Sequence, residues 1–282
     1  MSGIQRDHAG TDLASANLPA EHVERLRTAG SVAIDPRLFE ELYLSPHNVV
    51  KGNLRKTFGN PTPLALVGFI LCLTPFSCDL MGWRGAGGNG AAGTATYFFY
   101  GGLLMIIGSV LEFFLGNTFP FVVFGSFGAF WLSYGGTLQP FYNAAGAYAG
   151  GNQGVGLSSA GFTNSFAFFL LFFAFLNFIY MIASIRTNVV FFFIFFFLVI
   201  TMTIIAGSFW QAGQGNASFA MTLQKTGGGF AFVVSMLGWY LFTAQILLAV
   251  DFPMVLPVGD LSTVVNGRSG RIAEPGVSTE SA

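Results

Sequence analysis

Two groups of polar residues stand at the edges of long apolar stretches, where they could meet a small charged solute. The first is Asn60-Pro61-Thr62-Pro63-Leu64, whose residue types suit the first turn of a helix. Asn60 can cap the helix, and Pro61 can fill its first position, where an N–H is not needed. Such a start leaves N–H groups and the positive end of a helix dipole for a small anion. The pattern is equally that of an ordinary helix start.

The second group centres on Glu112, the acidic residue that lies clearly inside an apolar stretch. An ionisable side chain within a membrane span is a candidate for binding or proton transfer. Glu112 could also reach the membrane surface or cap the next turn. Other polar residues in these stretches, among them Tyr134, Thr201 and Thr203, could line a path or hydrogen-bond between helices. Since the stretches contain no Lys or Arg, a small, weakly acidic or neutral solute is favoured over a multivalent anion.

Six long apolar stretches must position these residues. Charged residues make up 9% of the chain and apolar residues 53%, whereas soluble domains contain about 25% charged residues. Each stretch is long enough to cross a bilayer as a helix. The sequence therefore predicts an all-α integral membrane bundle of six transmembrane helices, at approximately 62–81, 94–114, 120–140, 161–183, 188–210 and 228–250.

The remaining charge lies mostly in two tails. Residues 1–56 contain seven of the twelve basic residues and are predicted to be a cytosolic N-terminal tail. Residues 57–256 would form the transmembrane domain, and residues 257–282 a cytosolic C-terminal tail. With six spans, ten Lys and Arg residues face the side of the tails and only Arg84 and Lys225 face the other side. Because cytoplasmic segments retain positive charge, both termini are predicted to be cytoplasmic.

Cysteine and histidine usage argues against a metal centre. Cys72 and Cys78 are six residues apart, on different faces of a helix, and the three histidines, His8, His22 and His47, all lie in the N-terminal tail. We expect no metal and no cofactor. The absence of a nucleophile–base pair or a phosphate loop argues against an enzyme, and a net charge of −1 gives no field for nucleic acid.

Several motifs resemble those of the acetate uptake transporter family, which includes bacterial succinate and acetate permeases and fungal acetate transporters. The family signature Asn-Pro-Ala-Pro-Leu-Gly-Leu, followed three residues later by Phe, corresponds to residues 60–66 and Phe69. Its Tyr-Gly-Gly element corresponds to the stretch that begins at Tyr100, and its Glu before Gly-Asn-Thr-Phe corresponds to Glu112. The resemblance covers residues 59–262, and the long N-terminal tail favours the fungal type.

The resemblance also implies where the pathway is narrowest. In this family an aromatic and aliphatic constriction is formed by the Phe after the signature, a Tyr in the third span and a Leu in the fifth. Matching by motif places these at Phe69, Phe127 and Leu198. Phe127 departs from the usual Tyr and removes a hydroxyl. Met105 stands for a usual Gln and Leu241 for a usual Asn, so the interior becomes more apolar.

The resemblance implies a plasma-membrane transporter or channel for acetate and related short monocarboxylates, linked to protons. It implies one pore in each protomer of a homo-hexamer in the lipid bilayer. The pathway would be lined by residues 60–64, Tyr100, Glu112 and the constriction. Two alternatives stay open: an ammonia or ammonium exporter, and a transport-deficient sensor or scaffold in acid adaptation whose N-terminal tail binds cytosolic proteins.

Overall fold

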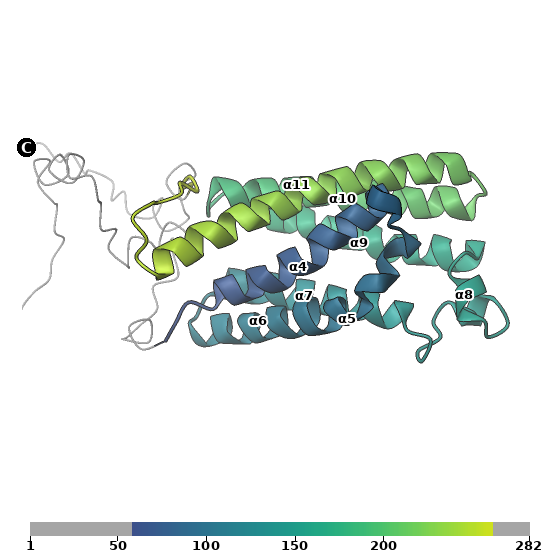
Figure 1. Ribbon diagram of the computed structural model, residues 1–282, viewed down its shortest axis with the longest axis horizontal. Helices are drawn as coiled ribbons and strands as arrows, with labels where there is room; N and C mark the ends of the chain where they lie inside the picture. Colours follow the sequence, from purple (N-terminus) through teal and green to yellow (C-terminus); the bar gives the residue numbers. More distant parts are fainter. Residues whose placement is uncertain (1–57, 262–282) are drawn as a thin grey trace, which may run out of the picture. The chain divides into compact units, whose positions relative to one another are not determined.

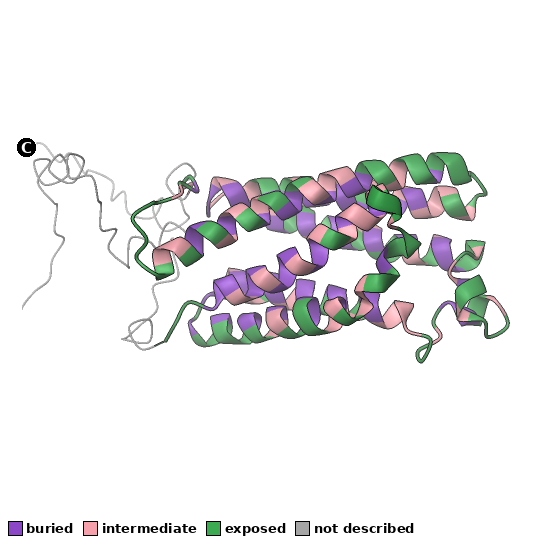
Figure 2. Ribbon diagram, viewed as in Figure 1, coloured by how far each residue is buried: buried purple, intermediate pink, exposed green. Residues whose placement is uncertain are grey.

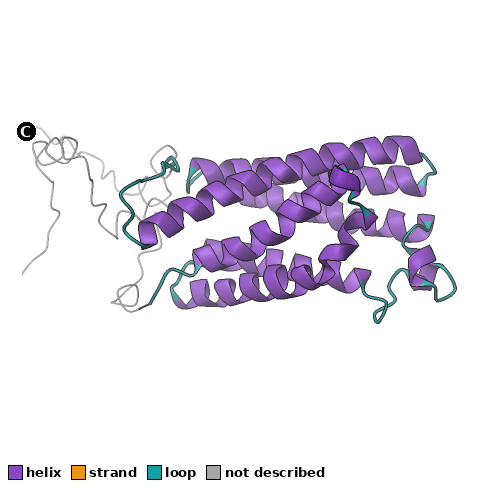
Figure 3. Ribbon diagram, in the orientation of Figure 1, coloured by secondary structure: helices purple, strands orange, loops and turns teal. Residues whose placement is uncertain are grey.

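The computed structural model describes residues 58–261, and within this range the chain forms helices joined by loops, without a β-strand (Figure 3). Six helical segments are long and apolar enough to cross a membrane, which confirms the predicted all-α class. In chain order they are α4 (Thr62–Met81), the segment Gly88–Phe114, α7 (Thr118–Leu138), α9 (Ala160–Ser184), α10 (Val189–Gly213) and α11 (Ala217–Ala249). The predicted N-terminal tail lies outside the described residues, as does most of the predicted C-terminal tail.

The second span is the least regular of the six. It starts with 3₁₀ turns at Gly88–Gly93 and a short α5 (Thr94–Thr96), continues as π-helix over Tyr97–Leu104, and ends as α6 (Met105–Phe114). This span begins six residues before the predicted position. Wide π turns are uncommon and often mark functional positions in helices.

The last span also begins earlier than predicted, at Ala217 instead of residue 228. The apolar stretch starts after Lys225, but the helix extends beyond it, and Gly227 and Gly228 let the helix approach its neighbours closely. A Cβ on Gly228 would lie 2.8 Å from the Cβ of Leu80 in α4, and one on Gly227 would lie 2.5 Å from Cδ1 of Ile205 in α10. Tertiary packing therefore outweighs the low helix propensity of glycine at this point.

The helices form a closed bundle (Figure 1). Helix α10 packs between α9 and α11, α11 packs on α4, and α4 packs on the second span, which in turn packs on α7. Aromatic rings connect α7 to α9: the Phe127 and Phe173 ring centroids are 5.2 Å apart, and those of Phe130 and Phe173 are 4.5 Å apart. We call the end where α4 begins and α11 ends the terminal end, and the opposite end the loop end.

A loop between α7 and α9 lies at the loop end and carries the short helix α8 (Gln153–Gly156). Residues 142–161 are rich in Gly, Ala and Asn and carry no charge, a composition that fits either a flexible or a closely packed loop. Gln153 accepts hydrogen bonds from the backbone N–H groups of Ala145 and Gly146, at 3.0 and 3.1 Å, and donates to the Thr137 carbonyl at 2.8 Å. The loop is therefore held to the end of α7 by one side chain.

At the terminal end, the chain after α11 returns to the corner between α9 and α10. The N–H of Val189 donates to the Gly259 carbonyl at 2.9 Å, and the N–H of Leu261 donates to the Thr187 carbonyl at 3.0 Å. Tyr240 adds a bond from its hydroxyl to the Pro257 carbonyl, at 2.6 Å. The first residues of the predicted C-terminal tail are thus attached to the bundle.

Burial separates an inward face from an outward face on each span (Figure 2). The outward faces carry large apolar side chains, among them Phe99, Phe113, Phe172 and Phe175, each at least 60% exposed. A surface of this kind suits lipid or another apolar partner and not water. Most of the abundant phenylalanines therefore serve the outer surface or the core.

Candidate functional site

Three of the spans, α4, α7 and α10, supply most of the wall of an internal path. Successive spans alternate in direction, and these three are the first, third and fifth. All three therefore run from the terminal end to the loop end. They border two cavities. The loop-side cavity has a volume of about 40 Å³, and the terminal-side cavity has a volume of about 20 Å³.

Three side chains line both cavities and therefore lie between them: Phe69 of α4, Phe127 of α7 and Leu198 of α10. All three are at most 5% exposed. The rings of Phe69 and Phe127 meet edge to face, with centroids 5.7 Å apart. The structure thus brings together the three residues that motif matching assigns to a constriction.

The wall of the terminal-side cavity is entirely apolar among the described residues. Besides the three shared side chains, it consists of Leu66, Met105, Val123, Phe124, Phe191, Ile194 and Phe195. Two of the three departures noted in the sequence contribute to this, because Phe127 and Met105 stand where the family resemblance implies polar side chains. A solute in this cavity finds no side chain that could replace its bound water.

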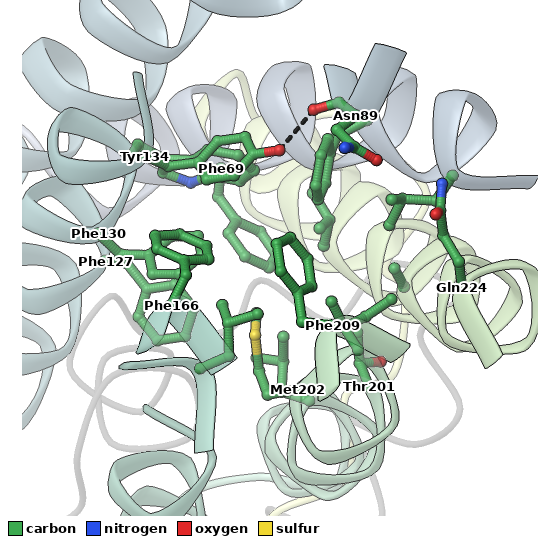
Figure 4. A pocket seen from close by; sticks show the side chains of 18 residues that line it. Phe69, Asn89, Phe127, Phe130, Tyr134, Phe166, Thr201, Met202, Phe209 and Gln224 are labelled. Carbon is green, nitrogen blue, oxygen red and sulfur yellow. Dashed lines mark hydrogen bonds between the residues drawn. The ribbon is translucent and has the colours of Figure 1, made fainter. Parts of the chain in front are cut away.

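The loop-side cavity differs because polar groups join its wall (Figure 4). Figure 4 shows the rings of Phe127, Phe130 and Phe166 gathered on one side of the cavity and Thr201 on another. The Tyr134 hydroxyl donates to the backbone carbonyl of Asn89, so its proton is already in use. Polar residues are thus present in this wall, but the surface that they present to the cavity is almost entirely apolar.

The start of α4 is organised by a buried group that we call the Glu112 cluster, consisting of Thr62, Glu112 and Asn117. The Thr62 hydroxyl donates to Oε1 of Glu112, and the Asn117 amide donates to Oε2 at 2.6 Å. All three side chains are fully buried. Both carboxylate oxygens accept hydrogen bonds, so Glu112 joins the start of α4 to the corner between α6 and α7.

The expectation of free N–H groups at the start of α4 is wrong. Pro61 and Pro63 have no N–H, the Thr62 N–H donates to Oδ1 of Asn60 at 3.0 Å, and the Leu64 N–H donates to the Pro61 carbonyl at 3.1 Å. The helix begins at Thr62 with Pro61 as its cap residue, one position later than predicted. The carboxylate found beside this turn is that of Glu112 itself.

Tyr100 lies away from both cavities, with 42% of its surface exposed. Three residues earlier, Tyr97 is only 1% exposed, and its ring stacks on that of Trp131 with centroids 5.1 Å apart. Its hydroxyl donates a hydrogen bond to the Gly90 carbonyl at 2.8 Å. Gly101 makes room for this stack, because a Cβ there would lie 2.5 Å from Cγ of Trp131. Sequence reasoning missed Tyr97 and Trp131, and the small residue at position 101 was the available signal.

Six membrane-length helices around a narrow internal path define a multi-pass membrane protein. Its sequence matches the profile described as the GPR1/FUN34/yaaH family over residues 44–263, and the chain belongs to this family. The resemblance seen in the motifs is thereby confirmed.

Relatives of this chain include proteins named for acetate transport and for ammonia transport. The chain is 45% identical to protein alcS of Aspergillus fumigatus over 234 residues, which are 82% of this chain and 86% of that protein. It is 30% identical over 204 residues to acetate transporter protein patA of Aspergillus clavatus, covering 72% of this chain and 79% of patA. It is also 30% identical over 211 residues to ammonia transport outward protein 2 of Saccharomyces cerevisiae, covering 72% of this chain and 68% of that protein.

Among solved structures, the bacterial acetate channel SatP has the same fold. The match has a TM-score of 0.57 and 23% sequence identity, and it covers 72% of this chain and 99% of the SatP chain. Nearly the whole SatP chain therefore has a counterpart in the helical bundle described above.

Proposed function

We propose that this protein is a membrane transporter or channel for acetate and related short monocarboxylates. The observation that carries the proposal is the pair of cavities that share the side chains of Phe69, Phe127 and Leu198. Two small cavities separated by a constriction suit a solute of a few atoms. The named relatives that carry acetate in their descriptions support the choice of solute, and a transport role leaves no part for enzymatic catalysis.

The apolar wall of the terminal-side cavity favours proton-linked transport. An ionised carboxylate that leaves water without new hydrogen bonds pays a far larger cost than a neutral polar group, for which the cost is about 2–7 kcal/mol. A short acid would therefore pass Phe69, Phe127 and Leu198 in its protonated form. Each molecule that crosses would bring one proton with it.

The remaining predicted residues act at the mouth of this path. Glu112 would fix the start of α4, and residues 60–64 would shape the opening beside it, with Asn60 holding the backbone and not the solute. Tyr100, on the outer surface of the protomer, would face lipid or a neighbouring protomer. We place the protein in the plasma membrane as a homo-hexamer, with both termini in the cytoplasm because ten of its twelve basic residues lie on that side.

Uptake of radiolabelled acetate into cells that lack their own acetate transporters tests the proposal. Cells that display the protein at their surface should accumulate label faster than cells with an empty vector, and more so at acidic external pH. Unlabelled propionate should compete. Uptake at the empty-vector level, with surface display verified, would contradict the proposed function.

Ammonia release is the second candidate, favoured by the relative named for outward ammonia transport. An apolar constriction also suits neutral NH₃ better than NH₄⁺. This function predicts ammonia release from expressing cells in the absence of acetate. A sensor or scaffold function would instead depend on the N-terminal tail. Deletion of residues 1–50 separates the two, because a scaffold should lose its phenotype whereas a transporter should continue to conduct.

A further inference from the structure

The turn between α10 and α11 carries the only acceptor sequence for N-linked glycosylation in the chain. N-linked glycans are attached to the Asn of Asn-X-Ser or Asn-X-Thr, where X is any residue except proline. Asn216-Ala217-Ser218 fits this pattern. Asn60 is followed by Pro61 and is excluded, and no other Asn in the sequence has Ser or Thr two positions later. So short a motif needs support from its place in the fold.

The length of α11 places this motif outside the bilayer. The helix has 33 residues and is about 50 Å long, whereas the hydrocarbon core of a bilayer is about 30 Å thick. Its apolar stretch begins near residue 228, after the charged Lys225, so the excess length lies at the loop end. Residues 217–227 raise Asn216 by roughly 17 Å above the start of that stretch, which exceeds the roughly 5–8 Å depth of a headgroup layer.

The turn that contains Asn216 has room for a bulky group. Figure 1 shows it at the loop end, where α10 and α11 join. Asn216 and Ser218 are both exposed. Gly215, directly before Asn216, has a left-handed backbone with φ 82°, and a Cβ there would meet nothing within 4 Å. A glycan at this turn would therefore extend away from the bundle.

The side chain of Asn216 does not cap the helix that follows it. An Asn directly before a helix usually accepts a hydrogen bond from the first turn through its side-chain oxygen, but Asn216 makes no such bond. Its Nδ2 instead donates to Oε1 of Gln211 at 2.8 Å, in an exposed contact. A side-chain amide has two N–H donors, so the replacement of one hydrogen by a sugar leaves the other for Gln211. The modification therefore does not have to break this contact.

We propose that Asn216 is an N-glycosylation site. Its Nδ2 forms a bond to C1 of the first sugar of an oligosaccharide carried on a lipid pyrophosphate. The bond between C1 and the pyrophosphate oxygen breaks, the lipid pyrophosphate leaves, and the amide loses one proton. The inference goes beyond transport but rests on the proposed orientation, in which the loop end, with Arg84 and Lys225, faces away from the cytoplasm.

Electrophoretic mobility of the full-length protein from yeast cells, with and without endoglycosidase treatment, tests the site. The wild type should run as a larger species that the endoglycosidase converts to the unmodified size. N216Q and S218A should run at the unmodified size without treatment, whereas S218T keeps the acceptor pattern and should keep the glycan. N216Q should take up acetate at the wild-type rate, because Asn216 lines neither cavity.

Two further substitutions in the N216Q background separate the site from the orientation. G154T gives Asn152, at the loop end, a threonine two positions later, and a Cβ on Gly154 meets only the Asn152 side chain, at 3.5 Å. V50T does the same for Asn48 in the predicted N-terminal tail. G154T should acquire a glycan and V50T should not.

An unmodified wild type overturns the site. If G154T is then modified, the proposed orientation stands and Asn216 alone is refuted, whereas modification of V50T contradicts the orientation as well. A shift of the wild type that persists in N216Q also overturns the site. Acetate uptake is measured in the same cells, so a glycosylated protein without uptake would contradict the proposed function and leave the site in place.

Discussion

The two cavities on either side of Phe69, Phe127 and Leu198 differ in what their walls offer a solute. At the terminal end the polar groups lie outside the cavity, in the Glu112 cluster, and the wall itself is apolar. At the loop end polar residues such as Thr201 are among those that line the cavity, and the Trp131 indole nitrogen and the Thr201 hydroxyl have no hydrogen-bond partner within residues 58–261. The two halves of the path therefore differ in the residue types that line them, and the polar residues lie at the loop end.

The largest effect is expected at the Glu112 cluster, which keeps the terminal end in place. Glu112→Ala removes the acceptor to which the buried Thr62 and Asn117 donate, and we expect a loss of about 3 kcal/mol or more in unfolding free energy. Thermal unfolding of the purified protein measures it.

Glu112→Gln should lose less, because its amide oxygen still accepts one of the two bonds. If the cluster is purely a terminal-end anchor, acetate uptake by Glu112→Gln should keep the wild-type pH profile. A displaced profile at equal surface display would show that Glu112 handles protons, and the terminal end would then do more than anchor the helices.

A second change tests the wall behind the loop-side cavity. Gly101→Ala places a Cβ 2.5 Å from Cγ of Trp131, and we expect an overpacking cost of about 1–3 kcal/mol together with displacement of the indole. Gly229→Ala is the matched control, since a Cβ there meets nothing within 4 Å. That control should be neutral or stabilising by up to about 1 kcal/mol, as expected for alanine in a helix. Equal stability of the two variants in thermal unfolding would refute the tight contact.

The boundary between the two cavities is addressed by Phe127→Tyr, which returns the usual hydroxyl of this family. The new hydroxyl would stand among apolar rings, including Phe69 at 5.7 Å and Phe173 at 5.2 Å, so a polar group would enter the narrowest section. We expect the ratio of acetate to propionate uptake to change about two- to tenfold, corresponding to roughly 0.4–1.4 kcal/mol. Phe172→Tyr, on the exposed face of α9, should leave the ratio unchanged. Identical ratios in both variants would remove Phe127 from the path.

The smallest expected effect is a difference in stability between substitutions of two tyrosines in the second span. Tyr97→Phe loses the hydrogen bond to the Gly90 carbonyl at the loop end and should cost about 1 kcal/mol. Tyr100→Phe, whose hydroxyl lies on the outer face, should change stability by less than about 0.5 kcal/mol. Chemical denaturation of the two variants side by side gives the comparison, and a larger loss in Tyr100→Phe would reverse the assignment of inner and outer positions.

Much of the fold could be predicted from the sequence because membrane spans are defined by local properties. Apolar length alone placed α4, α7, α9 and α10 within two residues at their starts and within three at their ends. The start of α11 was missed because an apolar stretch cannot include Gln224 and Lys225, whereas the helix continues through them to Ala217.

The site was predictable where a residue's role depends on its position along a helix, and less so where it depends on hydrogen bonding. Phe69, Phe127 and Leu198 could be named from motifs, and their role as a constriction stays a prediction. The pairing of the Thr62 N–H with Asn60 depends on three-dimensional neighbours that no spacing rule specifies. The same is true of the Thr201 hydroxyl, which has no hydrogen-bond partner in the part of the chain that the structure describes. Hydropathy can be read from each residue in turn, whereas hydrogen-bond pairing is known only once the helices are packed.

The bonds that attach the chain after α11 to the corner before α10 have a mechanical consequence. Because Gly259 and Leu261 are tied to Val189 and Thr187, tension applied beyond Leu261 would be delivered to the first turn of α10 and not to the last turn of α11. Helix α10 also carries Leu198, which forms part of the narrowest section. The segment after α11 is therefore mechanically connected, through α10, to the wall of that section.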